Sequence, residues 1–218
     1  MLKALTQEQI DLIIDKATEA FADKGFAGAK ISGIAKEAGV SVGVIYKYYE
    51  DKEALFTACV EKCLGYLDEV FEETAEKDGG IMEMVSELIR KNQEAAKAHP
   101  EYFRLYHQIT VKSPGDAAGI AEMIEGRSAR LYTRLIEKAA EDGEVRDDID
   151  PALFAFFFDD LMMMLHFAYA TEYYEERFRV YCGDGVTDRD EEVRGQLMRF
   201  IAGALGAADP EVTGKEGK

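Results

Sequence analysis

A short segment near the N-terminus carries phenolic and cationic side chains that could bind phosphate. Tyr46, Lys47 and Tyr48 are consecutive, and Lys52 follows in the first turn of a predicted helix. The helix dipole disfavours a cation at that end, so the lysine is easier to understand if an anion lies outside the protein. A DNA phosphate is such an anion, and the segment therefore suggests contacts with nucleic acid.

Two short helices joined by a tight turn are predicted to position these side chains. Gly39 ends the first helix, because glycine takes the left-handed conformation at no steric cost. Ser41 can cap the second helix, Val42–Tyr48, by accepting a hydrogen bond from a backbone N–H one turn in. Asp51 can cap a third helix that starts at Lys52. The pattern is typical of a helix-turn-helix followed by a longer helix.

This segment, AKEAGVSVGVIYKYYEDKEALF, resembles the DNA-binding segment of the TetR family of bacterial transcriptional regulators. It departs from the family at Ala29 and Lys30, where a threonine is usual, and at Tyr49-Glu50, where Phe-Pro is common. Gly33 also stands inside the first motif helix, at a cost of about 1 kcal/mol relative to alanine. The matching features are Ile34-Ala35, Ala38-Gly39-Val40-Ser41, Gly43, Tyr46 and Lys52-Glu53-Ala54-Leu55.

The resemblance implies DNA contacts by residues of the motif and its flanks. Tyr46 and Lys52 are expected to touch phosphates, and Lys30 to replace the phosphate contact of the missing threonine. The alternative for Tyr46 is that its ring only packs within the N-terminal DNA-binding domain, residues 1–52, called the head below. Side chains nearer the base edges are expected to include Ser41, Val42 and Lys47. The full set of predicted contacts is Lys30, Ser41, Val42, Gly43, Tyr46, Lys47, Tyr48 and Lys52.

Composition favours an all-α protein and argues against general binding to nucleic acid. The 218 residues include 47% hydrophobic residues and four prolines, and the net charge is −17. Residues 1–58 hold seven lysines and nine acidic residues, a net of −2, so the remaining −15 lies in residues 59–218. A strongly acidic chain is not a general nucleic-acid binder. Specificity should therefore rest on a few contacts within a head that can still present a basic face.

Helical periodicity continues to residue 205, and the family resemblance implies three regions. They are a helix-turn-helix DNA-binding domain at 1–52, a helical ligand-binding and dimerisation domain at 53–206, and a flexible tail at 207–218. A rod of helical period from Lys52 to Thr74 joins the first two regions. The other predicted helices are 6–24, 82–98, 101–111, 117–141, 151–174 and 191–205, the first with a Thr6–Gln9 capping box.

Metal, redox and catalytic chemistry find little support in the sequence. Cys59 and Cys63 are i, i+4 neighbours, but further ligands at metal-binding spacing are not found near them, so buried structural cysteines are expected. Three histidines and two aspartates could also bind a metal, yet HExxH and CxxC spacings are absent. These residues are His99, His107, His166, Asp159 and Asp160. We therefore predict neither a cofactor nor an enzyme.

The family resemblance also implies a sensor body, in which a small ligand relieves repression and the last two helices form a dimer. The dimer is predicted through Pro151–Tyr174 and Glu191–Leu205, on a palindromic operator. A membrane span is not expected, because aspartates and a histidine interrupt the apolar stretch, and the protein should be cytoplasmic. Alternatives are an activator, a regulator controlled by a partner protein, or a helical enzyme or metal module fused to a DNA head. Candidate ligand-binding residues are Phe103, Tyr106, His107, Met123 and Met163.

Overall fold

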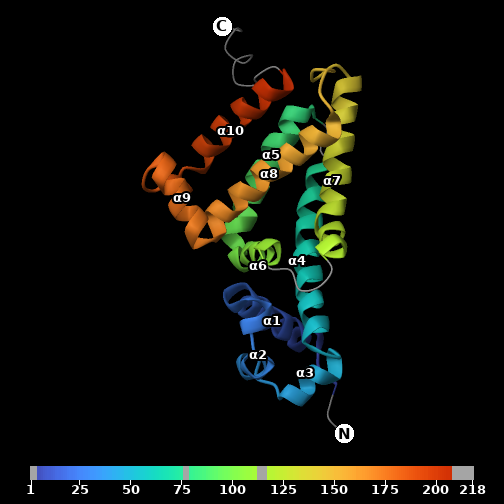
Figure 1. Ribbon diagram of the computed structural model, residues 1–218, viewed down its shortest axis with the longest axis vertical. Coiled ribbons are helices and arrows are strands. Elements are labelled where there is room, and N and C mark those ends of the chain that lie inside the picture. Colours follow the sequence, from blue (N-terminus) through green and yellow to red (C-terminus); the bar gives the residue numbers. More distant parts are fainter. Residues whose placement is uncertain (1–3, 76–78, 112–116, 208–218) are drawn as a thin grey trace. The chain divides into compact units, whose positions relative to one another are not determined.

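The computed structural model describes residues 4–75, 79–111 and 117–207, and within these ranges the regular elements are all helical (Figure 1). The predicted tail from Ala207 lies outside them except for its first residue. The fold class predicted from composition and periodicity is confirmed. The helices are α1 Gln7–Gly28, α2 Ile31–Glu37, α3 Val42–Tyr48, α4 Lys52–Ala75, α5 Ile81–Ala98, α6 Pro100–Val111, α7 Ala117–Glu141, α8 Pro151–Ala170, α9 Glu172–Cys182, the 3-10 turn η1 Val186–Asp188, and α10 Asp190–Leu205.

The chain divides into two compact units. The first contains Met1–Asp68 and His99–Ala117, so α6, which packs against α1, belongs to the same unit as α1–α3 and the N-terminal part of α4. The second contains Glu69–Ala98 and Ala118–Lys218. This division reflects which helices pack together. The boundary predicted after residue 52 instead separates DNA binding from ligand binding, and it stays a prediction. The helix α4 contributes residues to both units.

Aromatic rings form the centre of the first unit. Phe21 on α1 is fully buried, and its ring meets that of Phe56 edge-on at 5.1 Å between centroids. Phe26 packs on the same Phe56 ring at 5.2 Å. The helix predicted at 6–24 is interrupted where that range ends, because Gly25 has non-helical backbone angles, φ +66° and ψ 170°; a further helical segment then continues α1 to Gly28. The predicted Thr6–Gln9 capping box is present.

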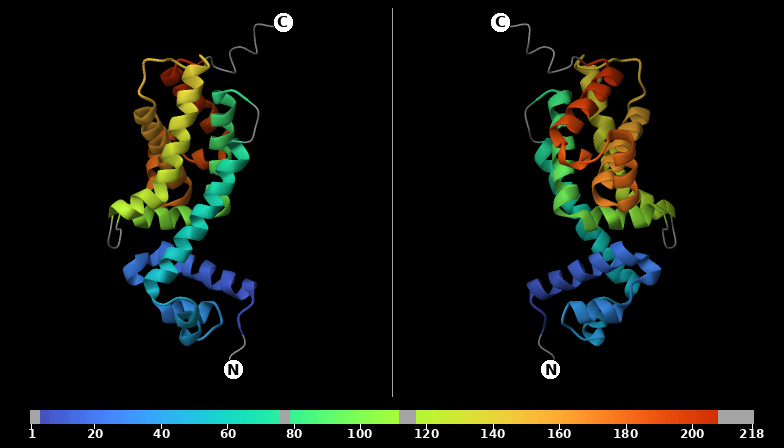
Figure 2. Two further views of the ribbon diagram at one scale, coloured as in Figure 1. Left: turned by 90° about the vertical axis from the view of Figure 1, so that its right-hand side faces the viewer. Right: turned by 90° about the vertical axis from the view of Figure 1, so that its left-hand side faces the viewer.

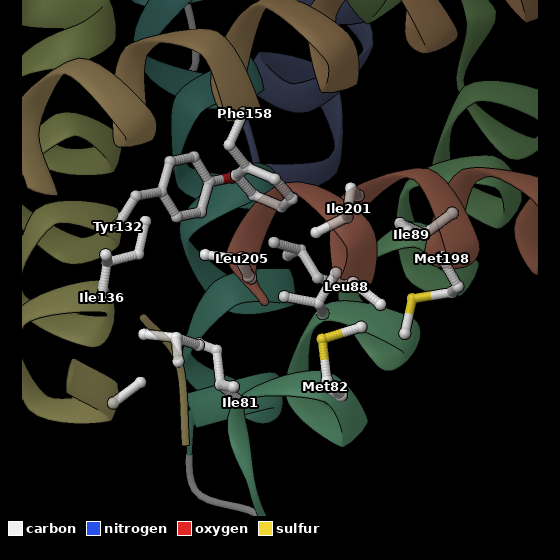
Figure 3. Close-up of a cluster of buried hydrophobic side chains, with 14 of the residues drawn as sticks. Ile81, Met82, Leu88, Ile89, Tyr132, Ile136, Phe158, Met198, Ile201 and Leu205 are labelled. Carbon is white, nitrogen blue, oxygen red and sulfur yellow. The ribbon is translucent and has the colours of Figure 1, made fainter. Parts of the chain in front are cut away.

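The second unit is built around a core contributed by α5, α7, α8 and α10 (Figure 3). The ring of Tyr132 on α7 meets Phe158 on α8 edge-on at 4.9 Å. Ile89 on α5 and Ile201 on α10 are fully buried in the same cluster. Helix α5 packs against α8, and α10 packs against α5 (Figure 2). This core fixes the positions of α8 and α10, whose outer surfaces carry the features described below.

The apolar stretch predicted as one helix to Tyr174 is in fact two helices. Thr171 has extended backbone angles, φ −127° and ψ 137°, and its hydroxyl donates to the carbonyl of Phe167 at 2.9 Å. Threonine can bond to backbone in this way and so compete with the helical ladder. Helix α9, Glu172–Cys182, follows directly and was not predicted, and Gly183 caps it.

Among the described residues, α8 is long and apolar enough to cross a membrane by length and composition alone. A core helix passes the same test, and one side of α8 is buried within the second unit. The buried side chains there include Ala155, Phe158, Met162 and Leu165. We therefore interpret α8 as a core helix.

Candidate functional site

The turn between α2 and α3 has the geometry that the sequence predicts. Gly39 has φ +68°, and the N–H of Val40 donates to the carbonyl of Ala35 at 2.9 Å. The Ser41 hydroxyl accepts from the N–H of Val44 at 3.3 Å and so caps α3. These local bonds fix the direction in which α3 leaves the turn.

Helix α3 is anchored on one side and open on the other. Ile45 is fully buried and packs the helix into the head. Five of the predicted contact residues are exposed on α3 or at its cap, so the structure brings them together. Among them, 38% of Val42 and 49% of Tyr46 is exposed, large fractions for side chains of this kind. The five are Ser41, Val42, Gly43, Tyr46 and Lys47.

The remaining predicted contact residues lie at the flanks of the motif. Tyr48 is half-buried, and its hydroxyl accepts a hydrogen bond from the N–H of Leu5 at 2.7 Å, which ties the N-terminal segment to α3. Lys30 is exposed at the N-cap position of α2, where it makes no side-chain cap. The ammonium of Lys52 lies 4.8 Å from the centroid of the Phe26 ring. Asp51 caps α4 by accepting from the N–H of Ala54 at 2.8 Å.

Replacing Lys52 by alanine should weaken binding to all DNA sequences alike. If its ammonium neutralises a phosphate, the slope of log K against log salt should fall by about 0.9 for each bound protomer. Fluorescence anisotropy of a labelled duplex at several salt concentrations measures this slope. Lys97→Ala is the matched control, because Lys97 lies in the second unit and pairs with Asp190 at 2.6 Å. An unchanged slope in Lys52→Ala would remove this residue from the phosphate contacts.

The five predicted ligand-binding residues are divided between the two units. Phe103, Tyr106 and His107 lie on α6 in the first unit, where Phe103 is almost fully buried. Burial lowers the pKa of His107 below its ordinary value. Met123 on α7 and Met163 on α8 lie in the second unit, and Met123 is exposed. None of the five lines either of the two cavities described next, and their role stays a prediction.

A cavity of about 590 Å³ lies within the second unit, lined by α8, α9, η1 and α10. Two arginines contribute to its wall. Arg189 donates to the carbonyl of Cys182 at 2.7 Å and to Glu192 at 3.3 Å, and the guanidinium of Arg177 lies 5.3 Å from the Tyr181 ring centroid. Sequence reasoning missed this cavity because it missed α9. The lining is Leu161, Met164, Leu165, Ala168, Tyr174, Arg177, Phe178, Cys182, Val186, Arg189, Glu192, Val193, Gln196 and Leu197.

A smaller cavity of about 390 Å³ lies in the first unit and is mostly polar. Its charged groups are largely paired with each other: Lys16 with Glu19 at 2.8 Å, and Lys62 with Asp15. Charges that already neutralise one another leave little attraction for a charged ligand, so this cavity is the weaker candidate.

The cysteine pair is structural. Cys59 and Cys63 are both buried, and burial raises the pKa of Cys59 to about 12 and that of Cys63 further above its ordinary value. A thiol held in its neutral form is a poor nucleophile and a poor metal ligand. Across residues 4–75, 79–111 and 117–207, no group of three or more His, Cys, Asp or Glu side chains could hold a metal ion.

An exposed, capped second helix after a tight turn, in a chain whose described elements are all helical, is the geometry of a helix-turn-helix. The family model "Bacterial regulatory proteins, tetR family" matches residues 13–59. The chain is 34% identical over 143 residues to the "Fatty acid metabolism regulator protein" of Bacillus subtilis. The aligned residues make up 65% of this chain and 73% of that protein. The chain belongs to the TetR family, and it is a transcriptional regulator and not an enzyme.

A second relative is the "Biofilm operon icaADBC HTH-type negative transcriptional regulator IcaR" of Staphylococcus epidermidis. The two are 34% identical over 56 residues, which is 26% of this chain and 30% of that protein. The identity therefore reaches beyond the helix-turn-helix in the first relative and is confined to a short segment in the second.

Solved structures share the fold over most of the chain. A TetR-like regulator from Rhodococcus sp. RHA1 superposes with a TM-score of 0.70 at 19% identity, covering 92% of this chain and all of the other. The fatty acid degradation regulator FadR from Bacillus halodurans gives 0.67 at 22%, covering 87% and 97%. AibR, solved with isovaleryl coenzyme A and operator DNA, gives 0.68 at 18%, covering 87% and 96%.

Proposed function

We propose that the protein is a cytoplasmic repressor that binds a palindromic operator as a homodimer and is released by a small ligand. The observation that carries the DNA part is the exposed face of α3, held by the buried Ile45. In this proposal residues 1–52 bind DNA and residues 53–206 bind the ligand and the second copy. One relative is named as a negative regulator, which supports repression over activation.

Exposed apolar side chains on α8 and α10 support the dimer. Leu153, Phe156 and Phe157 on α8 and Phe200 on α10 are each about 60% exposed. Large apolar patches are uncommon on monomeric proteins and are typical of interaction sites. A two-fold dimer would present two copies of α3 to half-sites about 34–36 Å apart, or a multiple of that spacing.

We propose that the ligand carries an acyl chain and an anionic group, and that it occupies the cavity of α8, α9 and α10. The cavity wall is mainly apolar, with Leu165, Phe178 and Leu197 among its residues, as an acyl chain requires. Arg177 is proposed to bind a carboxylate or phosphate of the ligand, whereas the guanidinium of Arg189 is already paired with Glu192 at 3.3 Å. The name of the Bacillus subtilis relative refers to fatty acid metabolism, and AibR binds an acyl coenzyme A.

Helix α4 is the proposed route from ligand to DNA. It begins at Lys52, directly after the motif, and continues without a break to Ala75 in the second unit. Its 24 residues span roughly 36 Å at about 1.5 Å per residue. A small tilt at one end would change the spacing of the two recognition helices in a dimer. The ligand can shift this equilibrium only by its differential affinity for the two states, typically about 1–3 kcal/mol.

The test is a titration of acyl coenzyme A thioesters of increasing chain length against the operator complex. The operator comes from selection on a random duplex library, and anisotropy reports DNA affinity. We expect one chain-length range to weaken operator binding by about 5- to 150-fold, with coenzyme A alone inactive. Arg177→Gln should require more ligand, whereas Arg130→Gln, an exposed arginine on α7 paired with Glu122, should behave as wild type.

Two outcomes would contradict parts of this proposal. If an acyl thioester binds, measured by calorimetry, and operator affinity does not change, the coupling is wrong although DNA binding stands. If the ligand instead strengthens binding at the operator, the protein is an activator or a co-repressed regulator. Recovery of the thioester unchanged separates a sensor from an enzyme.

A further inference from the structure

We infer that Val42 reads the 5-methyl group of a thymine in each operator half-site. The inference rests on the proposed sequence-specific binding through α3, and it adds the chemistry of one contact. Val42 is the first residue of α3, where recognition helices of this class place their base contacts.

The exposure of Val42 is not explained by packing within the head. Ile45 supplies the buried anchor of α3, whereas 38% of Val42 faces solvent. A β-branched residue also has a low helix propensity, so an exposed helical valine gains nothing from its local conformation. The side chain is therefore better explained by a contact made in the DNA complex.

The backbone next to Val42 is exposed. Apart from its chain neighbours and its own helix, a Cβ added at Gly43 would meet only the Ser41 hydroxyl, at 3.9 Å, so no other element covers this position. Tyr46, one turn further on, is 49% exposed and extends the apolar strip along the same side of α3. A glycine lowers helix stability relative to alanine, but here it allows the backbone to approach another surface closely.

The chemistry of the major groove selects the partner. Guanine, cytosine and adenine present hydrogen-bonding groups there, and thymine adds an apolar methyl group. Valine has only methyl groups to offer, so it would leave a polar base edge without its water and without a replacement hydrogen bond. The thymine methyl is the group that Val42 can cover without this loss.

The experiment compares thymine with deoxyuridine, which pairs identically and lacks only the methyl group. The operator selected by wild-type protein is synthesised with each thymine of both half-sites replaced in turn. One symmetric pair of replacements should weaken binding by about 10-fold, about 3- to 4-fold for each methyl group lost. Val42→Ala should weaken binding to the thymine operator by a similar factor, and it should be insensitive to the replacement at that position.

A matched variant separates this contact from a general loss of exposed apolar surface. Leu12 on α1 is 41% exposed in the same unit, and Leu12→Ala should keep the full preference for thymine. Equal binding of wild type to the two operators overturns the inference, and so does a Val42→Ala protein that keeps the preference. A wild-type protein that selects no sequence from the library overturns the proposed specific DNA binding itself.

Discussion

Phe157→Asp is expected to convert the proposed dimer to a monomer and to weaken operator binding by at least about 100-fold. Phe157 is 60% exposed on α8, so an aspartate there costs little packing within one protomer. In the dimer it would bury an unpaired carboxylate, which is strongly unfavourable. Two linked heads bind two half-sites with an avidity about 10²–10⁴-fold higher than the affinity of a single head for one half-site. A monomer loses this gain.

Sedimentation equilibrium at micromolar concentration and anisotropy on the operator measure the two effects. Phe200→Asp, on the neighbouring interface helix α10, should reproduce both, because 63% of that ring is exposed. Tyr181→Asp is the matched control: Tyr181 is 78% exposed but lies on α9, outside the predicted interface. The proposed interface is wrong if both phenylalanine variants remain dimers.

The helix-turn-helix could be predicted closely because its geometry is set by neighbouring residues. The start of α3 follows from Ser41, which caps the helix through its own hydroxyl, and from the turn at Gly39, where φ is positive. Asp51 and Thr6 act in the same local way on α4 and α1. A cap needs only a few residues of sequence, and so the sequence is sufficient to place it.

The cavity of the second unit could not be predicted, because it depends on distant residues. Thr171 interrupts an apolar run whose composition gives no warning, and the break creates α9. The environment of Phe103 could not be predicted either, because an aromatic ring is equally suited to a ligand pocket and to a hydrophobic core. Its burial in the first unit comes from the packing of α6 on α1. Residue type alone does not distinguish these environments.

Asp159 is a largely buried carboxylate whose pKa is strongly raised in the folded protein. It lies on α8, where burial raises its pKa to about 7, with further contributions from the charges of Glu125 on α7 and Asp160. The nearby phenol of Tyr132 is buried, and its pKa is also raised well above its ordinary value. A protonated carboxyl is thus favoured in the fold.

The raised pKa makes the folded state less stable as pH rises. The unfolded chain releases this proton near pH 3.8, whereas the folded protein keeps it until about pH 7. Stability from this group is therefore complete below about pH 4 and is lost as pH increases to 7. At about 1.36 kcal/mol per pH unit, the loss between pH 5.5 and 7 is about 2 kcal/mol.

Asp159→Asn should remove this dependence, because an amide stays neutral at every pH. Urea unfolding at fixed protein concentration should show the variant gaining about 2 kcal/mol over wild type between pH 5.5 and 8.5. Asp147→Asn, an exposed carboxylate in the same unit, is the control and should follow wild type at both pH values. If Asp159→Asn also follows wild type across this range, Asp159 is already ionised at pH 5.5 in the folded protein. Asp159 on α8 and Glu125 on α7 would then both be solvated, and their charges would not lower the stability of the core at neutral pH.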